Sequence, residues 1–146
     1  MMITKTVAIL LITLIVECQC KPKRIEKNVV NSYNMMDFGN IDRNPIAYLR
    51  YGNYCGLGSR GTIPVDETDI CCMNHDNCYQ NTNCKGLYEG KFNFYSWKFQ
   101  NNEIICKPSA DPCDQANCEC DKAFVLCLKK APYNCKNALR PSNLFC

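Results

Sequence analysis

The cysteines constrain this chain more than any other feature, because disulfides between them would limit how its segments can be arranged. The chain has 14 cysteines in 146 residues, a share close to that of small disulfide scaffolds. Thiols become oxidised in the secretory pathway and stay reduced in the cytosol. The role of these cysteines therefore depends on where the protein is sent.

The amino-terminal segment has the form of a secretory signal peptide. Lys5 precedes an apolar stretch from Val7 to Val16, and Cys18-Gln19-Cys20 follows. About ten apolar residues are too few to span a bilayer. Residues 1–20 are therefore predicted to be a signal peptide, and the mature protein is expected to be secreted and extracellular. Cleavage after Cys20 leaves twelve cysteines, enough for six disulfides.

The next segment is basic and resembles a processing site. Residues 21–24 read Lys-Pro-Lys-Arg, so residues 21–33 are interpreted as a propeptide or N-terminal extension and residues 34–146 as one domain. From Ile25 onward 13 Lys and Arg balance 13 Asp and Glu. No basic surface for nucleic acid remains, so nucleic acid is not expected as a partner.

The sequence predicts a mainly α, disulfide-rich fold. A capping pair at Asn34 and Asp37 predicts a short N-terminal helix. Acids from Asp66 to Asp69 predict the start of a second helix that runs to about Asn81, and a third should run from near Asp114 to before Pro132. Alternation over residues 95–99, a polar turn and Ile104-Ile105 together predict a small β-hairpin. A glycine-rich loop at residues 54–61 completes the pattern.

The two long helices carry cysteines at matching intervals. Cys71 and Cys78 are seven residues apart, as are Cys120 and Cys127, so each pair occupies one helix face. Antiparallel helices would join the first cysteine of one pair to the last of the other. A parallel arrangement is equally allowed by the spacing, although it needs a long return connection.

The antiparallel arrangement brings together an acid–base pair. It would place His75, the only histidine of the chain, against Asp121 on the facing helix. An imidazole held by a buried carboxylate is a general base. No Ser or Cys nucleophile is positioned by a motif, so water is the expected nucleophile.

The residue after this histidine points to a metal. Asp76 occupies a neighbouring helix face, and a bridge from Cys72 to Cys55 would bring the glycine-rich loop towards it. The carboxylate and the loop carbonyls form an oxygen-only set that suits one calcium ion better than magnesium or zinc. The expected ligands are Asp76 and the backbone carbonyls of Tyr54, Gly56 and Gly58.

Three motifs resemble the secreted phospholipase A2 family. Residues 51–61, YGNYCGLGSRG, are similar to its calcium loop, residues 69–79, DICCMNHDNCY, to its active-site helix, and residues 118–121, CECD, to its third-helix signature. The segment at residues 44–51 and the final Phe145-Cys146 are similar to the group X branch. The resemblance covers about residues 34–127.

The resemblance implies calcium-dependent hydrolysis of the sn-2 ester of glycerophospholipids, which releases a fatty acid and a lysophospholipid. It implies that His75 and Asp121 are catalytic, that Tyr79 and Tyr95 hydrogen-bond Asp121, and that the Gly56 N–H completes an oxyanion site. The family's fold adds the expectation of antiparallel disulfide-linked helices and a β-wing.

The same resemblance implies the disulfide pairing and the partners. The implied bridges are Cys55–Cys72, Cys71–Cys127, Cys78–Cys120, Cys84–Cys113 and Cys106–Cys118, which leaves Cys135 and Cys146 to pair with each other. The expected partner is a phospholipid membrane or micelle surface, bound peripherally by a monomer. A cell-surface receptor is a further candidate partner.

Two other functions compete with the enzyme. A catalytically weak phospholipase-like toxin or receptor ligand would use the same fold, and a structural module would use only its disulfides. Silent relatives typically replace the residue at Asp76 or His75, and this chain keeps both. A structural module has no need of either residue beside the loop, so the enzyme is the favoured hypothesis.

Overall fold

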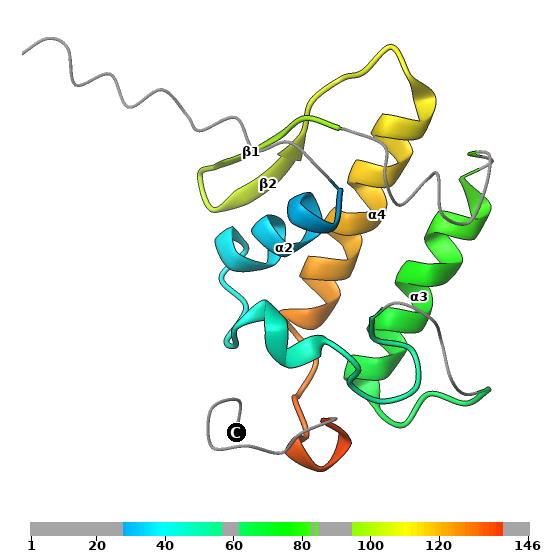
Figure 1. Cartoon of the computed structure of the whole chain (residues 1–146). Helices are drawn as coiled ribbons and strands as arrows, with labels where there is room; N and C mark the ends of the chain where they lie inside the picture. The colour runs from blue at the N-terminus through cyan, green and yellow to red at the C-terminus, as the bar shows by residue number, and fades with distance from the viewer. Residues whose placement is uncertain (1–27, 57–61, 83, 85–94, 139–146) are drawn as a thin grey trace, which may run out of the picture.

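The computed structural model describes residues 28–56, 62–82, 84 and 95–138. Two long helices, α3 (Glu67–Asn81) and α4 (Pro112–Leu128), lie side by side at its centre. The helix α2 (Asn28–Phe38) and the strand β2 (Glu103–Cys106) also contact α4, and the strand β1 (Trp97–Gln100) pairs with β2 (Figure 1). A short 3-10 turn, η1 (Pro45–Tyr48), lies between α2 and α3, and another, η3 (Cys135–Asn137), lies after α4. The mainly helical, disulfide-rich fold is confirmed.

Helix α3 begins where the acidic run predicts. Asp66 is the N-cap, and its carboxylate accepts a hydrogen bond from the Asp69 N–H at 2.9 Å. Glu67 and Asp69 lie in the first turn, where their charge opposes the positive end of the helix dipole. The helix ends at Asn81, as predicted.

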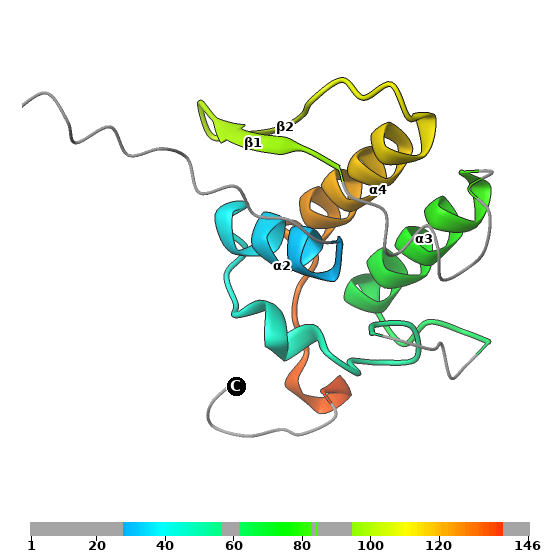
Figure 2. The same cartoon turned by 45° about the horizontal axis from the view of Figure 1, so that its top comes forward.

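The disulfides hold α3 and α4 antiparallel. Cys71 is bonded to Cys127 and Cys78 to Cys120, with a Cα–Cα distance of 5.7 Å in both bridges. Both views show the two helices side by side along their length (Figure 1 and Figure 2). The parallel alternative is therefore excluded, and the faces that carry His75 and Asp121 meet.

Three further bridges connect the periphery to this helix pair, and they join the cysteines that the resemblance implies. They are Cys55–Cys72, Cys84–Cys113 and Cys106–Cys118. Cys135 is also disulfide-bonded, and its expected partner Cys146 lies outside the described residues.

The predicted start of the first helix was wrong. The sequence placed it at Asn34, whereas α2 begins at Asn28 and runs through that position. Asn31 is fully buried, and its Nδ2 donates to the backbone carbonyl of Tyr95 at 3.1 Å. This distant contact stabilises the turn before the local capping signal, so the Asn34–Asp37 pair lies within the helix.

The β-hairpin forms where the alternating residues predict. Its strands pair antiparallel, with Trp97 opposite Cys106 and Gln100 opposite Glu103. Asn101 and Asn102 between them have φ angles of 53° and 64°, which a two-residue type I′ turn requires and asparagine tolerates. The Cys106–Cys118 bridge then joins the hairpin to α4.

The main core lies between α2, α4 and the hairpin. Its fully buried members include Met35, Val125 and Cys118, with Ile104 and Leu128 nearly so. Within the part of the chain that the structure describes, none of the helices is both long and apolar enough to cross a membrane.

Candidate active site

The centre of the site is a histidine–carboxylate pair that joins the two long helices. Nε2 of His75 on α3 lies 2.6 Å from Oδ1 of Asp121 on α4. Asp121 is fully buried, whereas the side chain of His75 is 18% exposed. A carboxylate only accepts hydrogen bonds, so Nε2 carries the ring proton and Nδ1 holds the free lone pair.

Two tyrosines complete the hydrogen bonds of this carboxylate. The Tyr79 hydroxyl donates to Oδ1 of Asp121 at 2.8 Å, and the Tyr95 hydroxyl donates to Oδ2. Burial, followed by the charge of Asp121, raises the pKa of both tyrosines well above the usual value. Both therefore remain neutral donors, and together with the histidine they stabilise a carboxylate that has no access to water.

An aromatic ring also holds the imidazole in place. Phe124 stacks on His75 with ring centroids 4.3 Å apart and planes inclined by 15°, and Tyr79 meets the same ring edge-on at 4.9 Å. Phe124 was not among the site residues predicted from the sequence. Its position three residues after Asp121 places both on one face of α4, which is the signal that could have identified it.

The glycine-rich loop reaches the same site from the other side of α3. The Cys55–Cys72 bridge holds the Cα atoms 5.0 Å apart, one helical turn before Asp76. Gly56 has a φ of +103°, and a Cβ there would lie 3.1 Å from the Arg50 nitrogen. Both its φ and this close approach suit glycine.

The predicted calcium ligands are only partly described. Tyr54, Gly56 and Asp76 line one cavity, while Gly58 lies outside the described residues. Among residues 28–56, 62–82, 84 and 95–138, no three His, Cys, Asp or Glu side chains are grouped to hold a metal ion. The predicted set has one carboxylate and otherwise backbone carbonyls, so this finding does not test it.

One cavity is lined both by the His75–Asp121 pair and by apolar residues. Its volume is about 210 Å³. His75, Asp76 and Asp121 line it. The cavity is also lined by apolar residues of α2, η1 and the residue after η1, namely Met36, Pro45, Tyr48 and Leu49. The site can therefore accept a molecule with a polar reacting group and an apolar chain.

The fold and this site define a small, disulfide-rich hydrolase with a histidine–carboxylate pair. The phospholipase A2 family profile matches residues 29–138. A phospholipase A2 from Bos taurus is 39% identical over 115 residues, which cover 75% of this chain and 72% of that protein. The chain belongs to the phospholipase A2 family, and it is an enzyme that hydrolyses phospholipids.

Proposed function

We propose that this enzyme hydrolyses the sn-2 ester of glycerophospholipids in a calcium-dependent reaction, releasing a free fatty acid and a lysophospholipid. The observation that carries the proposal is the 2.6 Å contact between His75 Nε2 and Asp121 Oδ1. It leaves His75 Nδ1 as the one imidazole nitrogen able to accept a proton, on a ring that lines the apolar cavity.

His75 and Asp121 are the proposed catalytic residues. Nδ1 of His75 would take a proton from a water molecule as that water attacks the ester carbonyl, and the imidazolium would return it to the leaving glycerol oxygen. Asp121 keeps the proton on Nε2 and stabilises the positive charge as it develops. A positioned general base of this kind is typically worth about 10²- to 10⁴-fold in rate.

Tyr79 and Tyr95 support this pair without touching the substrate. Their hydroxyls hold both carboxylate oxygens of Asp121, so the carboxylate cannot rotate away from the imidazole. Because burial and the charge of Asp121 raise the pKa of both phenols, they remain neutral donors at neutral pH. They are positioning residues.

The residues around the loop fit a calcium site. Asp76 and the Tyr54 and Gly56 backbone line the same cavity, and oxygen-only ligands with irregular geometry suit Ca²⁺. One calcium ion would be held by Asp76 and the carbonyls of Tyr54, Gly56 and Gly58. Bound there, it would supply Lewis-acid stabilisation of the substrate's phosphate and ester oxygens.

Gly56 has a second proposed role through its backbone N–H. A donor aimed at the ester oxygen would stabilise the charge that develops there during attack, an effect of about 3 kcal/mol for one donor. The same residue thus supplies a carbonyl to the cation and an N–H to the oxyanion. A donor on a disulfide-anchored loop needs little reorganisation when the reaction begins.

The apolar lining of the cavity is the proposed acyl-chain site. Met36, Pro45 and Leu49 line the same cavity as His75 and Asp121, so an acyl chain bound there would exclude water from the ester. The enzyme would reach such substrates as a monomer bound peripherally to a membrane or micelle surface. The signal peptide predicted at residues 1–20 and the many disulfides favour secretion to the extracellular space.

The decisive assay uses phosphatidylcholine vesicles with different acyl chains at sn-1 and sn-2. Wild-type protein with calcium should release only the sn-2 chain, and a chelator should abolish release. His75→Gln should lose at least about 10²-fold in rate. Asn74→Ala, an exposed position on the same helix, should behave as wild type.

Three results contradict the proposal. Release of the sn-1 chain would overturn the site specificity, and unchanged hydrolysis in chelator would overturn the calcium requirement. Folded protein that binds calcium and releases no fatty acid would favour the phospholipase-like toxin or receptor ligand instead.

A further inference from the structure

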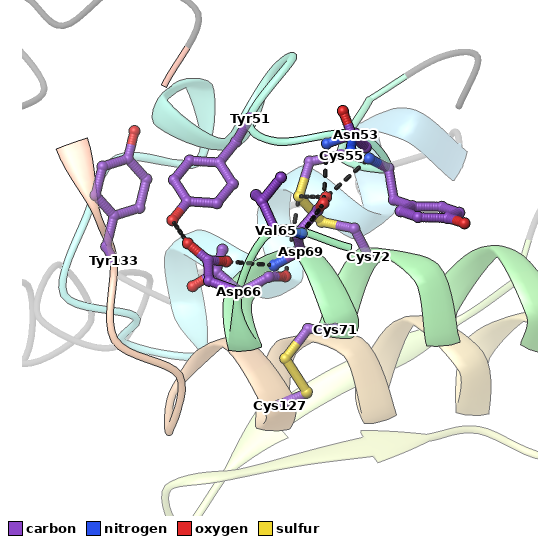
Figure 3. The surroundings of a disulfide bond; sticks show 12 residues. Tyr51, Asn53, Cys55, Val65, Asp66, Asp69, Cys71, Cys72, Cys127 and Tyr133 are labelled. Carbon is purple, nitrogen blue, oxygen red and sulfur yellow. Dashed lines mark hydrogen bonds between the residues drawn. A yellow bond between two sulfur atoms is a disulfide. The ribbon is translucent and has the colours of Figure 1, made fainter. Parts of the chain in front are cut away.

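A second buried carboxylate lies at the base of the glycine-rich loop. Asp69, in the first turn of α3, is fully buried. Its Oδ1 accepts from the Tyr54 N–H at 2.8 Å, and its Oδ2 accepts from the Asn53 N–H at 2.9 Å and the Val65 N–H at 3.0 Å. Figure 3 shows Asp69 facing the loop residues, beside the Cys55–Cys72 bridge.

This carboxylate departs from the usual role of an acid at its position. Asp69 is the third residue after the N-cap Asp66, where an acidic side chain commonly turns back to the N-cap N–H. Here it accepts instead from Val65, one residue earlier, and from two residues of a loop 15 and 16 positions away. One side chain therefore connects the start of α3 to the loop.

The arrangement makes a buried charge stable. Burying an isolated carboxylate is strongly unfavourable, but Asp69 receives three N–H donors and lies at the positive end of a helix dipole. The three N–H donors in turn need the carboxylate, because it is their hydrogen-bond acceptor. Without it, the Asn53 and Tyr54 N–H groups would lose their hydrogen-bond acceptor.

The backbone around the carboxylate is shaped to approach it closely. Gly52 has a φ of +56°, and a Cβ there would lie 2.4 Å from the Asp69 Cγ. Only glycine fits at that distance. The Gly52 N–H donates to the carbonyl of Asn137, so the loop is also held from the C-terminal side.

Two anchors thus hold the backbone at the residues proposed to contact calcium and substrate. The Asp69 carboxylate holds the N–H of Tyr54, and the Cys55–Cys72 disulfide holds the next residue. The carbonyl of Tyr54 and the backbone of Gly56 follow directly. Their placement relative to Asp76 on the same α3 helix is set by these anchors.

We infer that Asp69 is a positioning residue, whose buried carboxylate preorganises the Tyr54–Gly56 backbone for calcium before the ion arrives. The inference rests on the proposed calcium dependence. It assigns Asp69 no contact with the ion and no part in proton transfer. Its effect should fall on calcium affinity and leave the chemical step intact.

The test is calcium binding by titration calorimetry on the full secreted chain. Asp69→Asn keeps the shape of the side chain but replaces one acceptor oxygen with an NH₂ group, so at least one loop N–H loses its partner. The calcium Kd should rise about tenfold or more, a change of about 1.4 kcal/mol. At saturating calcium, kcat should return to within about threefold of wild type.

Thr68→Val is the matched control. Thr68 is the preceding residue, is fully buried, and donates to the Pro132 carbonyl rather than to the loop. This change should lower the Tm without altering the calcium Kd. An equal rise in Kd for both variants, or none for Asp69→Asn, would overturn the inference.

Hydrogen exchange on calcium-free wild-type protein gives a second test that needs no variant. The Asn53 and Tyr54 amides should be protected without calcium, because their acceptor belongs to the protein. Exchange at the rate of an open loop would refute preorganisation. Wild-type protein that binds no calcium in the calorimeter would refute the proposed function instead, so the two failures are distinguishable.

Discussion

Replacement of Asp121 by asparagine separates the charge of the proposed catalytic pair from its geometry. Asn has the same shape, and its Oδ1 can still accept from His75 Nε2 and Tyr79, which both bond Oδ1 in the native protein. Its NH₂ group would then face the Tyr95 hydroxyl, which now donates to Oδ2. The tautomer of His75 is kept, and the negative charge is lost.

The expected loss follows from the strength of the hydrogen bonds. A hydrogen bond to a charged group contributes about 1.5 to 3 kcal/mol and a neutral one about 1 kcal/mol. Losing charge assistance to the developing imidazolium should therefore raise the barrier by about 0.5 to 2 kcal/mol, which is about 2- to 30-fold in kcat. The buried Tyr95 hydroxyl loses its acceptor, so the free energy of unfolding should also fall by about 1 to 3 kcal/mol.

The assay measures fatty-acid release at saturating calcium and substrate, with the folded fraction determined by near-UV circular dichroism. Asp111→Asn is the control, because Asp111 is the exposed N-cap of the same helix and asparagine also caps well. A loss in kcat for Asp121→Asn as large as that for His75→Gln would refute the division into charge and geometry. A rate within twofold of wild type would show that the charge is not used.

Three further perturbations test the surrounding structure. Phe124→Leu removes the ring stacked on His75 and should lower kcat by about 2- to 10-fold, with an unchanged rate contradicting a role in holding the imidazole. Joint replacement of Cys78 and Cys120 by alanine leaves the Cys84–Cys113 bridge in place, so it opens a loop of about 15 residues (78–84 and 113–120) and should lower the free energy of unfolding by about 3 kcal/mol in urea melts; a change below about 1 kcal/mol contradicts this. Burial raises the pKa of Tyr51 to about 12, so between pH 10 and 12 the unfolded state loses this proton first. Wild type should therefore lose stability relative to Tyr51→Phe as the pH rises from 9 to 11, and a constant difference would contradict the argument.

Local signals predicted α3 and the hairpin because the residues that fix the start of the helix and the turn of the hairpin are neighbours in the sequence. Asp66 caps α3 with its own side chain, and Asn101 and Asn102 adopt the left-handed backbone that their turn needs. Helix α2 was mispredicted at its start for the opposite reason. Its first turns depend on the contact of Asn31 with Tyr95, 64 positions away, which no local pattern contains.

In the functional site, too, some features had a local sequence signal and others depended on distant contacts. The seven-residue cysteine spacing placed each cysteine pair on one helix face, and for antiparallel helices it predicted that His75 and Asp121 face each other. The bridges of the structure then excluded the parallel alternative. The contacts of Asp69 had no such signature, because its partners are backbone N–H groups that every residue except proline carries. The sequence therefore identified Asp69 only as a helix-start acid.

The proposed mechanism requires that His75 uses Nδ1 as the base while Asp121 holds Nε2–H. Because the chain has a single histidine, nitrogen-15 NMR of histidine-labelled protein observes this ring without ambiguity. At a pH where the ring is neutral, we predict the Nε2–H tautomer, with a slowly exchanging Nε2 proton. The Nδ1–H tautomer, or rapid exchange between the two, would contradict the account.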